Sequence, residues 1–170
     1  MKRFIFCLLS LICIQQAIAI NRYVDSSPGL NCIGNYSIAN RACNGADGDS
    51  YTTVAAGLPV TVAGDELRIR TGTYTSQITN VTAGVVNSGT SFADAVTIKA
   101  YNSEVVTINS TSNPTVNLAS ATNTNSYIIF DGLIIEDGMS LIFSHHIRVI
   151  NSTIKDSTTN CVQIGNSAPN

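Results

Sequence analysis

Large apolar residues recur in the C-terminal part of the chain with a spacing of about twenty residues. The segment 128–137, IIFDGLIIED, matches the segment 147–156, IRVINSTIKD, which lies nineteen positions further on. The match continues, now displaced by twenty-one positions, in the pairs Leu141/Val162 and Phe143/Ile164. Each copy therefore predicts three short strands, with a turn two residues longer in the second copy.

A unit of three strands in about twenty residues cannot bury its own hydrophobic face. Copies must stack so that each covers the next, and a repeat made of β rather than helical segments predicts a parallel β-solenoid. Upstream, in residues 67–70, leucine and isoleucine alternate with arginine, the period of a strand with one buried face. Further strands follow at 96–99, 106–108 and 116–118. Strand triplets from Leu67 to Ile164 give roughly four rungs, where a rung is one turn of the solenoid.

The first nineteen residues have the pattern of a secretory signal peptide. Lys2 and Arg3 give a short basic start, and residues 4–14 are apolar apart from one serine. Residues 17–19, Ala-Ile-Ala, form an A-x-A cleavage site. The apolar stretch is shorter than the ~20 residues that a membrane-spanning helix needs. We therefore expect a secreted protein, extracellular or at the cell surface, with no membrane span and a mature chain that begins at Ile20.

Removal of the signal peptide leaves an acidic chain. Lys2 and Arg3 leave with it, so the nine Lys and Arg of the full sequence become seven against eleven Asp and Glu, a net charge of −4. No cluster of basic residues remains. This argues against a nucleic-acid partner and against an anionic membrane surface, since both select basic patches.

Three cysteines remain in the mature chain, an odd number for an oxidising compartment. Cys32 and Cys43 enclose a loop rich in Gly and Asn, so a disulfide between them would hold a segment with little apolar content of its own. We predict that disulfide. Cys161 then has no obvious partner: it is either a small hydrophobic residue at a strand edge, or its partner lies beyond Asn170.

Residues 20–64 form a loop-rich N-terminal capping segment that leads into the solenoid. Only residues 50–62 have helical character: Ser50 could cap a helix in which Val54 and Leu58 share one face. A glycine and a proline limit that helix to a turn or two. We expect it to lie across the open end of the solenoid.

Four segments of the mature chain resemble successive landmarks of one protein family. They are 23–26 (YVDS), 64–74 (GDELRIRTGTY), 96–101 (VTIKAY) and 128–133 (IIFDGL). They look like the N-terminal half of secreted right-handed parallel β-helix proteins, the pectate-lyase-like superfamily. The resemblance covers nearly all of the mature chain. It implies an all-β fold, a right-handed, three-sheet parallel β-helix with a short N-terminal helical cap.

Members of this superfamily include lyases and hydrolases of acidic polysaccharides, epimerases, and phage or surface proteins without known catalysis. The landmarks are specific for the fold and not for an activity, so function follows from them only by analogy. The resemblance implies the N-terminal part of a polysaccharide-binding or polysaccharide-degrading, lyase-like protein, whose ligand or substrate includes acidic polysaccharides. The alternative is a non-catalytic surface or adhesion protein that uses the side of the solenoid as a binding face.

In this interpretation residues 65–170 are the rungs of the solenoid. Proteins of the family generally run to many more rungs, and the catalytic residues of the lyases usually sit on later ones. Only six residues follow Ile164, too few to cap the open end of a rung. We therefore expect further C-terminal rungs beyond Asn170; the alternative is a short solenoid that associates with itself. We expect the 170 residues alone to be inactive.

A site on a solenoid must come from outward side chains stacked rung on rung, about 4.8 Å apart. The repeat places Lys99 and Asp131 in one outward column, and Glu136 and Lys155 in another. An acidic-polysaccharide lyase needs a cation to neutralise the uronate and a Lys or Arg to take the α-proton. The residues of suitable type are Arg68, Arg70, Lys99 and Asp131. Charged neighbours in a ladder are also ordinary cross-strand pairs, so we assign no catalytic, cofactor-binding or metal-binding residue, and the cofactor is unknown.

Three other motifs are weaker. His145 and His146 are adjacent, so on a strand their rings would point to opposite faces, and we expect a solvated turn rather than a metal site. The segment 44–49, NGADGD, is rich in oxygen ligands but lacks the EF-hand spacing, which favours a turn. Chance explains the glycosylation sequons in a chain this rich in Asn, Ser and Thr; they begin at Asn35, Asn80, Asn109 and Asn151.

Overall fold

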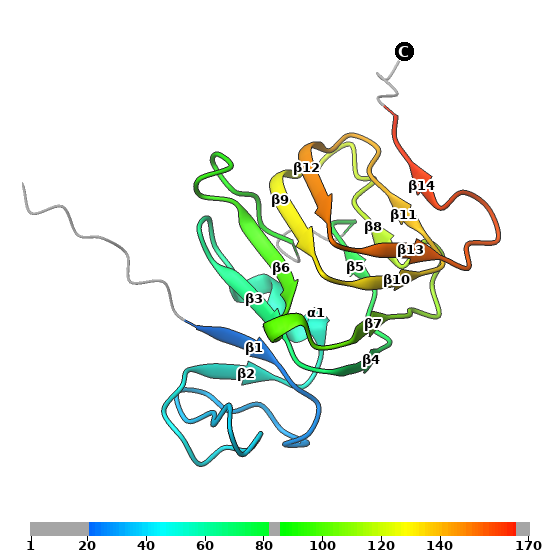
Figure 1. Cartoon of the computed structure of the whole chain (residues 1–170). Coiled ribbons are helices and arrows are strands. Elements are labelled where there is room, and N and C mark those ends of the chain that lie inside the picture. Colours follow the sequence, from blue (N-terminus) through cyan, green and yellow to red (C-terminus); the bar gives the residue numbers. More distant parts are fainter. Residues whose placement is uncertain (1–20, 82–85, 166–170) are drawn as a thin grey trace, which may run out of the picture.

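The computed structural model describes residues 21–81 and 86–165, so the predicted signal peptide of residues 1–19 lies outside the described residues. Within the described part, short strands follow one another around a shared interior and form three sheets (Figure 1). All strand pairs within these sheets are parallel. One short α-helix and two 3₁₀ turns accompany them.

The first sheet has six strands and the other two have four each. In spatial order the first sheet consists of β12 (His145–Ile150), β9 (Ser126–Asp131), β6 (Val96–Ala100), β3 (Glu66–Ile69), β1 (Arg22–Val24) and β2 (Asp49–Tyr51). The second consists of β13 (Thr153–Lys155), β10 (Ile134–Glu136), β7 (Val106–Ile108) and β4 (Gly72–Tyr74). The third consists of β14 (Val162–Gln163), β11 (Met139–Ser140), β8 (Val116–Asn117) and β5 (Ile78–Thr79).

Successive strands along the chain join the first, second and third sheet in turn. Four such triplets follow one another, from β3, β4 and β5 to β12, β13 and β14, and each strand pairs with its counterpart in the next rung. This is the arrangement of a parallel β-solenoid, as the sequence repeat predicts. The number of rungs in the described residues also agrees with the predicted four.

The nineteen-residue displacement between the last two rungs is confirmed. It is seen in the pairs Ile128/Ile147, Phe130/Val149 and Ile135/Ile154. Because the strand side chains alternate with a period of two, this register places the same face of both strands toward the interior. The repeated apolar positions are therefore the inward positions.

The displacement predicted for the third strand is wrong by two residues. Met139 pairs with Val162, twenty-three positions further on, and the amide of Leu141 donates to the carbonyl of Gln163 rather than aligning with Val162. The turn before the third strand is therefore four residues longer in the last rung, not two. A shift of two residues keeps the same side chains facing inward, so the hydrophobic pattern alone does not distinguish the two alignments.

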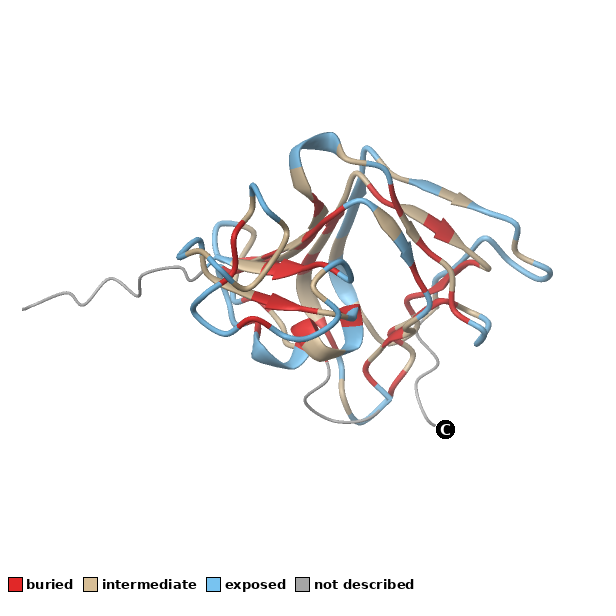
Figure 2. Cartoon of the chain, turned by 90° about the horizontal axis from the view of Figure 1, so that it is seen from below, coloured by how far each residue is buried: buried red, intermediate tan, exposed pale blue. Residues whose placement is uncertain are grey.

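The core lies between the three sheets, and buried residues, red in Figure 2, occur on strands of all three sheets. Fully buried inward residues include Leu67, Ile98, Ile108, Leu118, Phe130 and Ile135. Each such side chain stabilises the fold by about 1.5–3 kcal/mol. In the last rung, where no described strand lies beyond them, Val149, Val162 and Ile164 are 36%, 42% and 78% exposed.

The predicted helix is a single turn, α1 (Val54–Gly57), followed by the 3₁₀ turn η1 (Leu58–Val60). Val54 and Leu58 are buried in the same core as the strands, so the helix covers the N-terminal end of the core as expected. Its cap is Thr53, whose hydroxyl accepts from the amide of Ala56, and not Ser50, which lies in β2. The remaining 3₁₀ turn is η2 (Tyr101–Ser103), which follows β6.

The N-terminal segment contributes two strands that the hydrophobic pattern does not predict. β1 pairs with β3, and β2 pairs with β1, so both extend the first sheet. Cys32 exchanges backbone hydrogen bonds with Ser50 of β2, at 2.9 and 2.7 Å, and covers part of its edge. The predicted Cys32–Cys43 disulfide is present, while Cys161 is exposed and not in a disulfide. A disulfide of this kind stabilises by about 2–4 kcal/mol.

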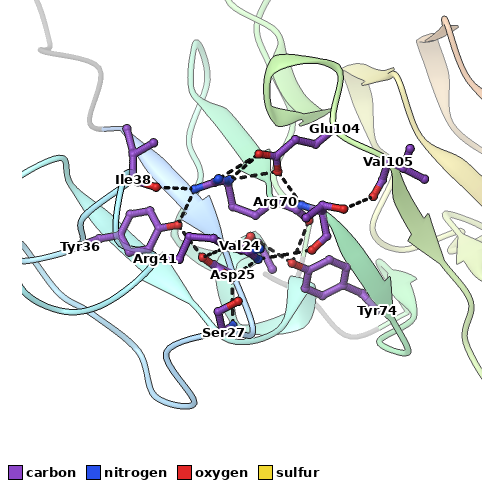
Figure 3. A network of polar contacts seen from close by, with 11 residues as sticks. Val24, Asp25, Ser27, Tyr36, Ile38, Arg41, Arg70, Tyr74, Glu104 and Val105 are labelled. Carbon is purple, nitrogen blue, oxygen red and sulfur yellow. Dashed lines mark hydrogen bonds and ion pairs between the residues drawn. The ribbon is translucent and has the colours of Figure 1, made fainter.

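A network of charged side chains ties the N-terminal segment to the first rung (Figure 3). Asp25, which is fully buried, accepts hydrogen bonds from Arg41 at 2.6 and 2.9 Å and from the Tyr36 hydroxyl at 2.6 Å. Arg70 donates to the same Tyr36 hydroxyl at 3.1 Å and pairs with Glu104 at 2.9 Å. Each buried charge therefore has an opposite charge beside it, which is the condition for burying it without a large cost.

The network holds both carboxylates in the ionised form. Burial acts to raise the pKa of Asp25, but the hydrogen bonds from Arg41 and Tyr36 outweigh it and keep that pKa below its ordinary value. Burial likewise acts to raise the pKa of Glu104, and the hydrogen bonds from Arg70 hold it below its ordinary value. Folding therefore favours release of both protons.

We expect the free energy of unfolding to be nearly constant from about pH 7 to pH 5 and to fall as the pH drops below about 4. A carboxyl group with a lowered folded-state pKa contributes stability above its unfolded pKa, and this is lost as the pH falls through the folded pKa. Asp25→Asn should cost about 3 kcal/mol or more at pH 7 and flatten the acid dependence. Urea unfolding at several pH values measures both, and an unchanged acid dependence in this variant would contradict the assignment. Asp156→Asn, at an exposed carboxylate, is the control.

The strand register makes a second prediction, at two neighbouring residues of β9. Phe130 is fully buried and Ile129 lies on the outer face. Phe130→Asp should prevent folding because it buries an unpaired charge, whereas Ile129→Asp should change the stability by less than about 1 kcal/mol. Circular dichroism and thermal unfolding of the two variants measure this difference. Equal damage at both positions would show that the register is wrong.

Candidate binding groove on the first sheet

The outer face of the first sheet carries a column of polar side chains. The strand register places at one level of β1, β3, β6 and β9 the residues Tyr23, Arg68, Lys99 and Asp131. Lys99 and Asp131 are direct cross-strand partners, so the outward column predicted from the repeat is confirmed. Parallel strands lie about 4.8 Å apart, which gives the column a regular spacing along the solenoid axis.

These side chains form the floor of a groove of about 790 Å³. The turns that follow the strands form its sides: Tyr101 in η2 after β6, Gly132 after β9, and Asn151 after β12. Ile38 of the N-terminal segment also lines it. The volume lies within the roughly 300–1,000 Å³ that small-molecule sites have in proteins.

Glu66 is the ionic centre of the groove. Its carboxylate lies 2.9 Å from Arg68 Nε and 3.5 Å from Lys99 Nζ, and all three side chains are about one-third exposed. Burial acts to raise the pKa of Glu66, but Arg68 and Lys99 hold that pKa below its ordinary value. Glu66 is therefore ionised at neutral pH, so it accepts hydrogen bonds and does not supply a proton.

Arg68 is a permanent donor in this groove. Burial acts to lower its pKa, but the hydrogen bonds with Tyr23 and Glu66 outweigh this and raise the pKa above its ordinary value. Its Nη1 donates to the Tyr23 hydroxyl at 3.3 Å and to Asn21 Oδ1 at 2.8 Å. A guanidinium that stays protonated orients a ligand and does not abstract a proton from it.

Asp131 closes the polar floor on the other side of Lys99. It accepts a hydrogen bond from Asn151 Nδ2 at 2.8 Å. Among the described residues Asp131 forms no ion pair, because Lys99 pairs with Glu66 instead. Asp131 therefore retains acceptor capacity toward the groove, whereas the charges of Glu66, Arg68 and Lys99 already neutralise one another in part.

Arg70 does not line the groove, although its residue type fits the predicted chemistry. It follows the end of β3, is 7% exposed, and is held by Glu104 and Tyr36 in the buried network. Its guanidinium carbon lies 4.9 Å from the centre of the ring of Tyr101, so Arg70 packs against a residue that lines the groove. Tyr23 contacts the same ring edge-on, with centroids 5.8 Å apart.

Sequence reasoning missed most of the residues that line the groove, among them Glu66, Tyr101 and Asn151. Glu66 alternates with buried Leu67, so the parity of the strand could have placed it on the outer face. Tyr101 and Asn151 lie in turns, where the hydrophobic period gives no side-chain direction. The side chains in these turns can therefore be assigned to the groove only from the structure.

The second predicted column lies elsewhere. Glu136 and Lys155 are cross-strand partners in the second sheet, and Lys155 Nζ lies 3.0 Å from Glu136 Oε1. Lys155 also contacts Asp156 at 2.9 Å and is 45% exposed. Exposed pairs of this kind contribute little to stability, so the column has the properties of an ordinary cross-strand ion pair.

The geometry expected for the histidine pair is wrong. His145 and His146 begin β12 rather than occupying a turn, and both are exposed with ring centroids 4.8 Å apart. His146 has a φ of 55°, so the regular alternation of the strand is interrupted and both rings lie on one side. Their Nδ1 atoms are 2.6 Å apart, which is a hydrogen bond between the rings.

The segment 44–49 uses its carboxylates for local structure. Asp47 accepts from the amide of Ile38 at 2.7 Å, and Asp49 accepts from the amide of Gly34 at 2.7 Å. In residues 21–81 and 86–165, no group of three or more His, Cys, Asp or Glu side chains lies close enough to hold a metal ion. Among the sequon asparagines, Asn80 is only 2% exposed.

The comparisons with known proteins add no relative. No protein-family model matches this chain, and no curated protein or solved structure matches it at a significant level. Across the residues that the structure describes, no helix is long and apolar enough to cross a bilayer. The function must therefore be argued from the groove, which offers a permanent cation, acceptor oxygens and an aromatic wall.

The groove makes a prediction about lyase chemistry. We expect no lyase activity from the 170-residue chain, because Arg68 stays protonated and the Lys99 ammonium is paired with Glu66. The measurement is the ultraviolet absorbance of unsaturated uronides, with pectate, alginate or chondroitin as substrate and added Ca²⁺. A rise in absorbance that Lys99→Ala removes would instead place a catalytic base in the groove.

Proposed function

We propose that this protein is an extracellular polysaccharide-binding protein that holds a sugar chain in the groove on the first sheet. The observation that carries the proposal is the groove itself, about 790 Å³ floored by a regular column of polar side chains and walled by Tyr101. Every sugar ring of a polysaccharide presents hydroxyl groups. The closely spaced donors and acceptors on the groove floor suit such a ligand.

The charges of the groove favour a sugar chain over nucleic acid. Two cations, Arg68 and Lys99, stand beside two carboxylates, Glu66 and Asp131, so the floor has no net excess of positive charge. Charged groups form strong hydrogen bonds with hydroxyl groups, and an aromatic ring packs against the C–H face of a pyranose. Nucleic acid would require an uninterrupted basic surface.

The location outside the cell rests on two observations. Residues 1–19 have the signal-peptide pattern, and the Cys32–Cys43 disulfide is compatible with an oxidising compartment. A protein in that compartment meets the polysaccharides of cell walls and extracellular matrices. The proposed ligand and the proposed location therefore agree.

We further propose that the solenoid is right-handed and related to the pectate-lyase-like superfamily. Parallel strands joined by a crossover are right-handed in about 98% of cases, which supports the hand. The sequence landmarks coincide with elements of the first sheet: 23–26 with β1, 96–101 with β6 and 128–133 with β9. The same resemblance supports polysaccharide as the ligand class.

Binding is the function proposed for these residues rather than catalysis. Glu66 is ionised and held by two cations, and Arg68 is a permanent donor, so neither provides a proton shuttle at neutral pH. The groups of the groove are suited to orient a ligand.

We expect the purified chain to be retarded in gels that contain a polysaccharide ligand, and Lys99→Ala to weaken that retention about 10-fold or more. The reason is the loss of a hydrogen bond from a charged group, worth about 1.5–3 kcal/mol. Affinity electrophoresis against pectate, alginate, chondroitin sulfate and xylan measures the retention.

The matched control is Lys155→Ala, which removes another partly exposed, ion-paired lysine from a different sheet. It should leave retention unchanged. Tyr101→Ala should weaken retention through the aromatic wall, provided that circular dichroism shows the fold intact. Equal retention of Lys99→Ala and the unaltered chain would contradict a ligand site in the groove.

A further inference from the structure

A cluster of aromatic rings and a guanidinium lies at the start of β9 and β12, away from the groove. Tyr127 and His146 stack with ring centroids 4.5 Å apart and planes 17° apart. Phe92 packs edge-on against Tyr127, with centroids 5.4 Å apart. The guanidinium carbon of Arg148 lies 3.6 Å from the centre of the Phe92 ring. We call Phe92, Tyr127, His146 and Arg148 the aromatic platform.

The loop that carries Phe92 is fastened to the start of β9. The amide of Gly89 donates to the carbonyl of Ser126 at 3.0 Å, and the amide of Ser126 donates to the hydroxyl of Ser88 at 3.1 Å. A Cβ at Gly89 would approach the Tyr127 carbonyl oxygen to 2.7 Å, so the loop fits there because position 89 has no side chain. The ring of Phe92 is therefore held in place beside Tyr127.

The backbone of the platform is strained in two consecutive rungs. Tyr127 has a φ of 54° and His146 a φ of 55°, in the left-handed region that bulky side chains rarely occupy. At both residues the left-handed conformation interrupts the regular alternation of side chains along the strand. Because the two residues lie at equivalent positions of neighbouring strands, their rings can stack outside the core. Strain of this kind costs free energy and is concentrated at functional sites.

The platform and the groove share one face of the solenoid. Arg148 stands in an outward column with Ile129, Thr97 and Glu66, and Glu66 lines the groove. Tyr127 precedes the groove residue Asp131 by four positions in the same strand, which is about 13 Å at the rise of a β-strand. A ligand that touches both therefore runs along the strands and is longer than a disaccharide.

The chemistry of the platform matches the same class of ligand. The partly exposed aromatic rings offer faces and edges for the C–H surface of a pyranose. Arg148 is exposed, and among the described residues it forms no ion pair, so its donors are available to hydroxyl or carboxylate oxygens. The groups that contact a sugar ring thus occur twice on this face, once at each end of the strands.

We propose that the aromatic platform is a second contact for the sugar chain held in the groove, so that the protein selects oligosaccharides longer than a disaccharide. This inference rests on the proposed function. It adds the direction of the ligand, along β9 and β12, and a minimum ligand length.

The test compares ligand lengths by isothermal titration calorimetry on the purified chain. The probes are digalacturonate and hexagalacturonate as acidic sugars, and cellobiose and cellohexaose as neutral ones. We expect a hexasaccharide to bind at least 10-fold more tightly than its disaccharide. Phe92→Ala and Arg148→Ala should each remove most of this difference while disaccharide binding stays unchanged, and Phe92→Tyr should restore it.

Lys99→Ala, in the groove, should instead weaken binding of both lengths, and Lys155→Ala should weaken neither. If Phe92→Ala does not fold, the exposed Arg148→Ala decides the outcome. Hexasaccharide binding that is unaffected by both platform variants would overturn this inference and leave the proposed function standing. Equal affinity for the two lengths in the unaltered chain would overturn it too. Absence of binding to all four probes would overturn both proposals.

Discussion

The stacking of equivalent inward positions from rung to rung is the constraint on which the rest of the structure depends. Phe130 lies over Ile98 and beneath Val149, and no single rung excludes water from its own apolar residues. Every second residue of each strand must therefore be apolar, because its side chain fills the interior. What remains free is the outward column, and the same stacking fixes its spacing. The groove inherits its regular floor of Arg68, Lys99 and Asp131 from the packing of the core.

The buried charges around Asp25 determine which side chains line the groove. They attach the disulfide-linked N-terminal segment to the first rung, which brings Ile38 to the groove. They also withdraw Arg70 from the solvent, so that its guanidinium supports Tyr101 instead of adding charge to the floor. The mixed charge of the groove therefore depends on a network that does not itself contact a ligand. Breaking such a buried pair is costly, whereas apolar residues of similar volume could replace the whole pair at little cost, so what these charges add beyond stability is the geometry of the groove.

The sequence predicts those features that follow from period and parity. The repeat gives the solenoid, the rungs, the nineteen-residue register and the Lys99 and Asp131 column, because each rests on which side chains must face inward. It does not give the third-strand register, because a shift of two residues leaves every inward residue inward. It also misses β1 and β2, which lie upstream of the repeat. Tyr101 and Asn151 lie in turns, where side-chain direction depends on backbone angles that a pattern does not encode.

The histidine pair shows why such failures are informative. The alternation of a strand separates His145 from His146, and that rule fails only because His146 takes a left-handed backbone conformation. Tyr127 breaks the same rule at the same level of the preceding rung, so the exception is itself repeated. A left-handed conformation also recurs at Asp137 and Asp156, which are likewise nineteen residues apart and follow β10 and β13. The pair at 127 and 146 differs because it lies within strands and carries aromatic rings that are not among the buried residues. The repeated backbone conformation therefore brings the two rings into contact outside the core, where they form the aromatic platform.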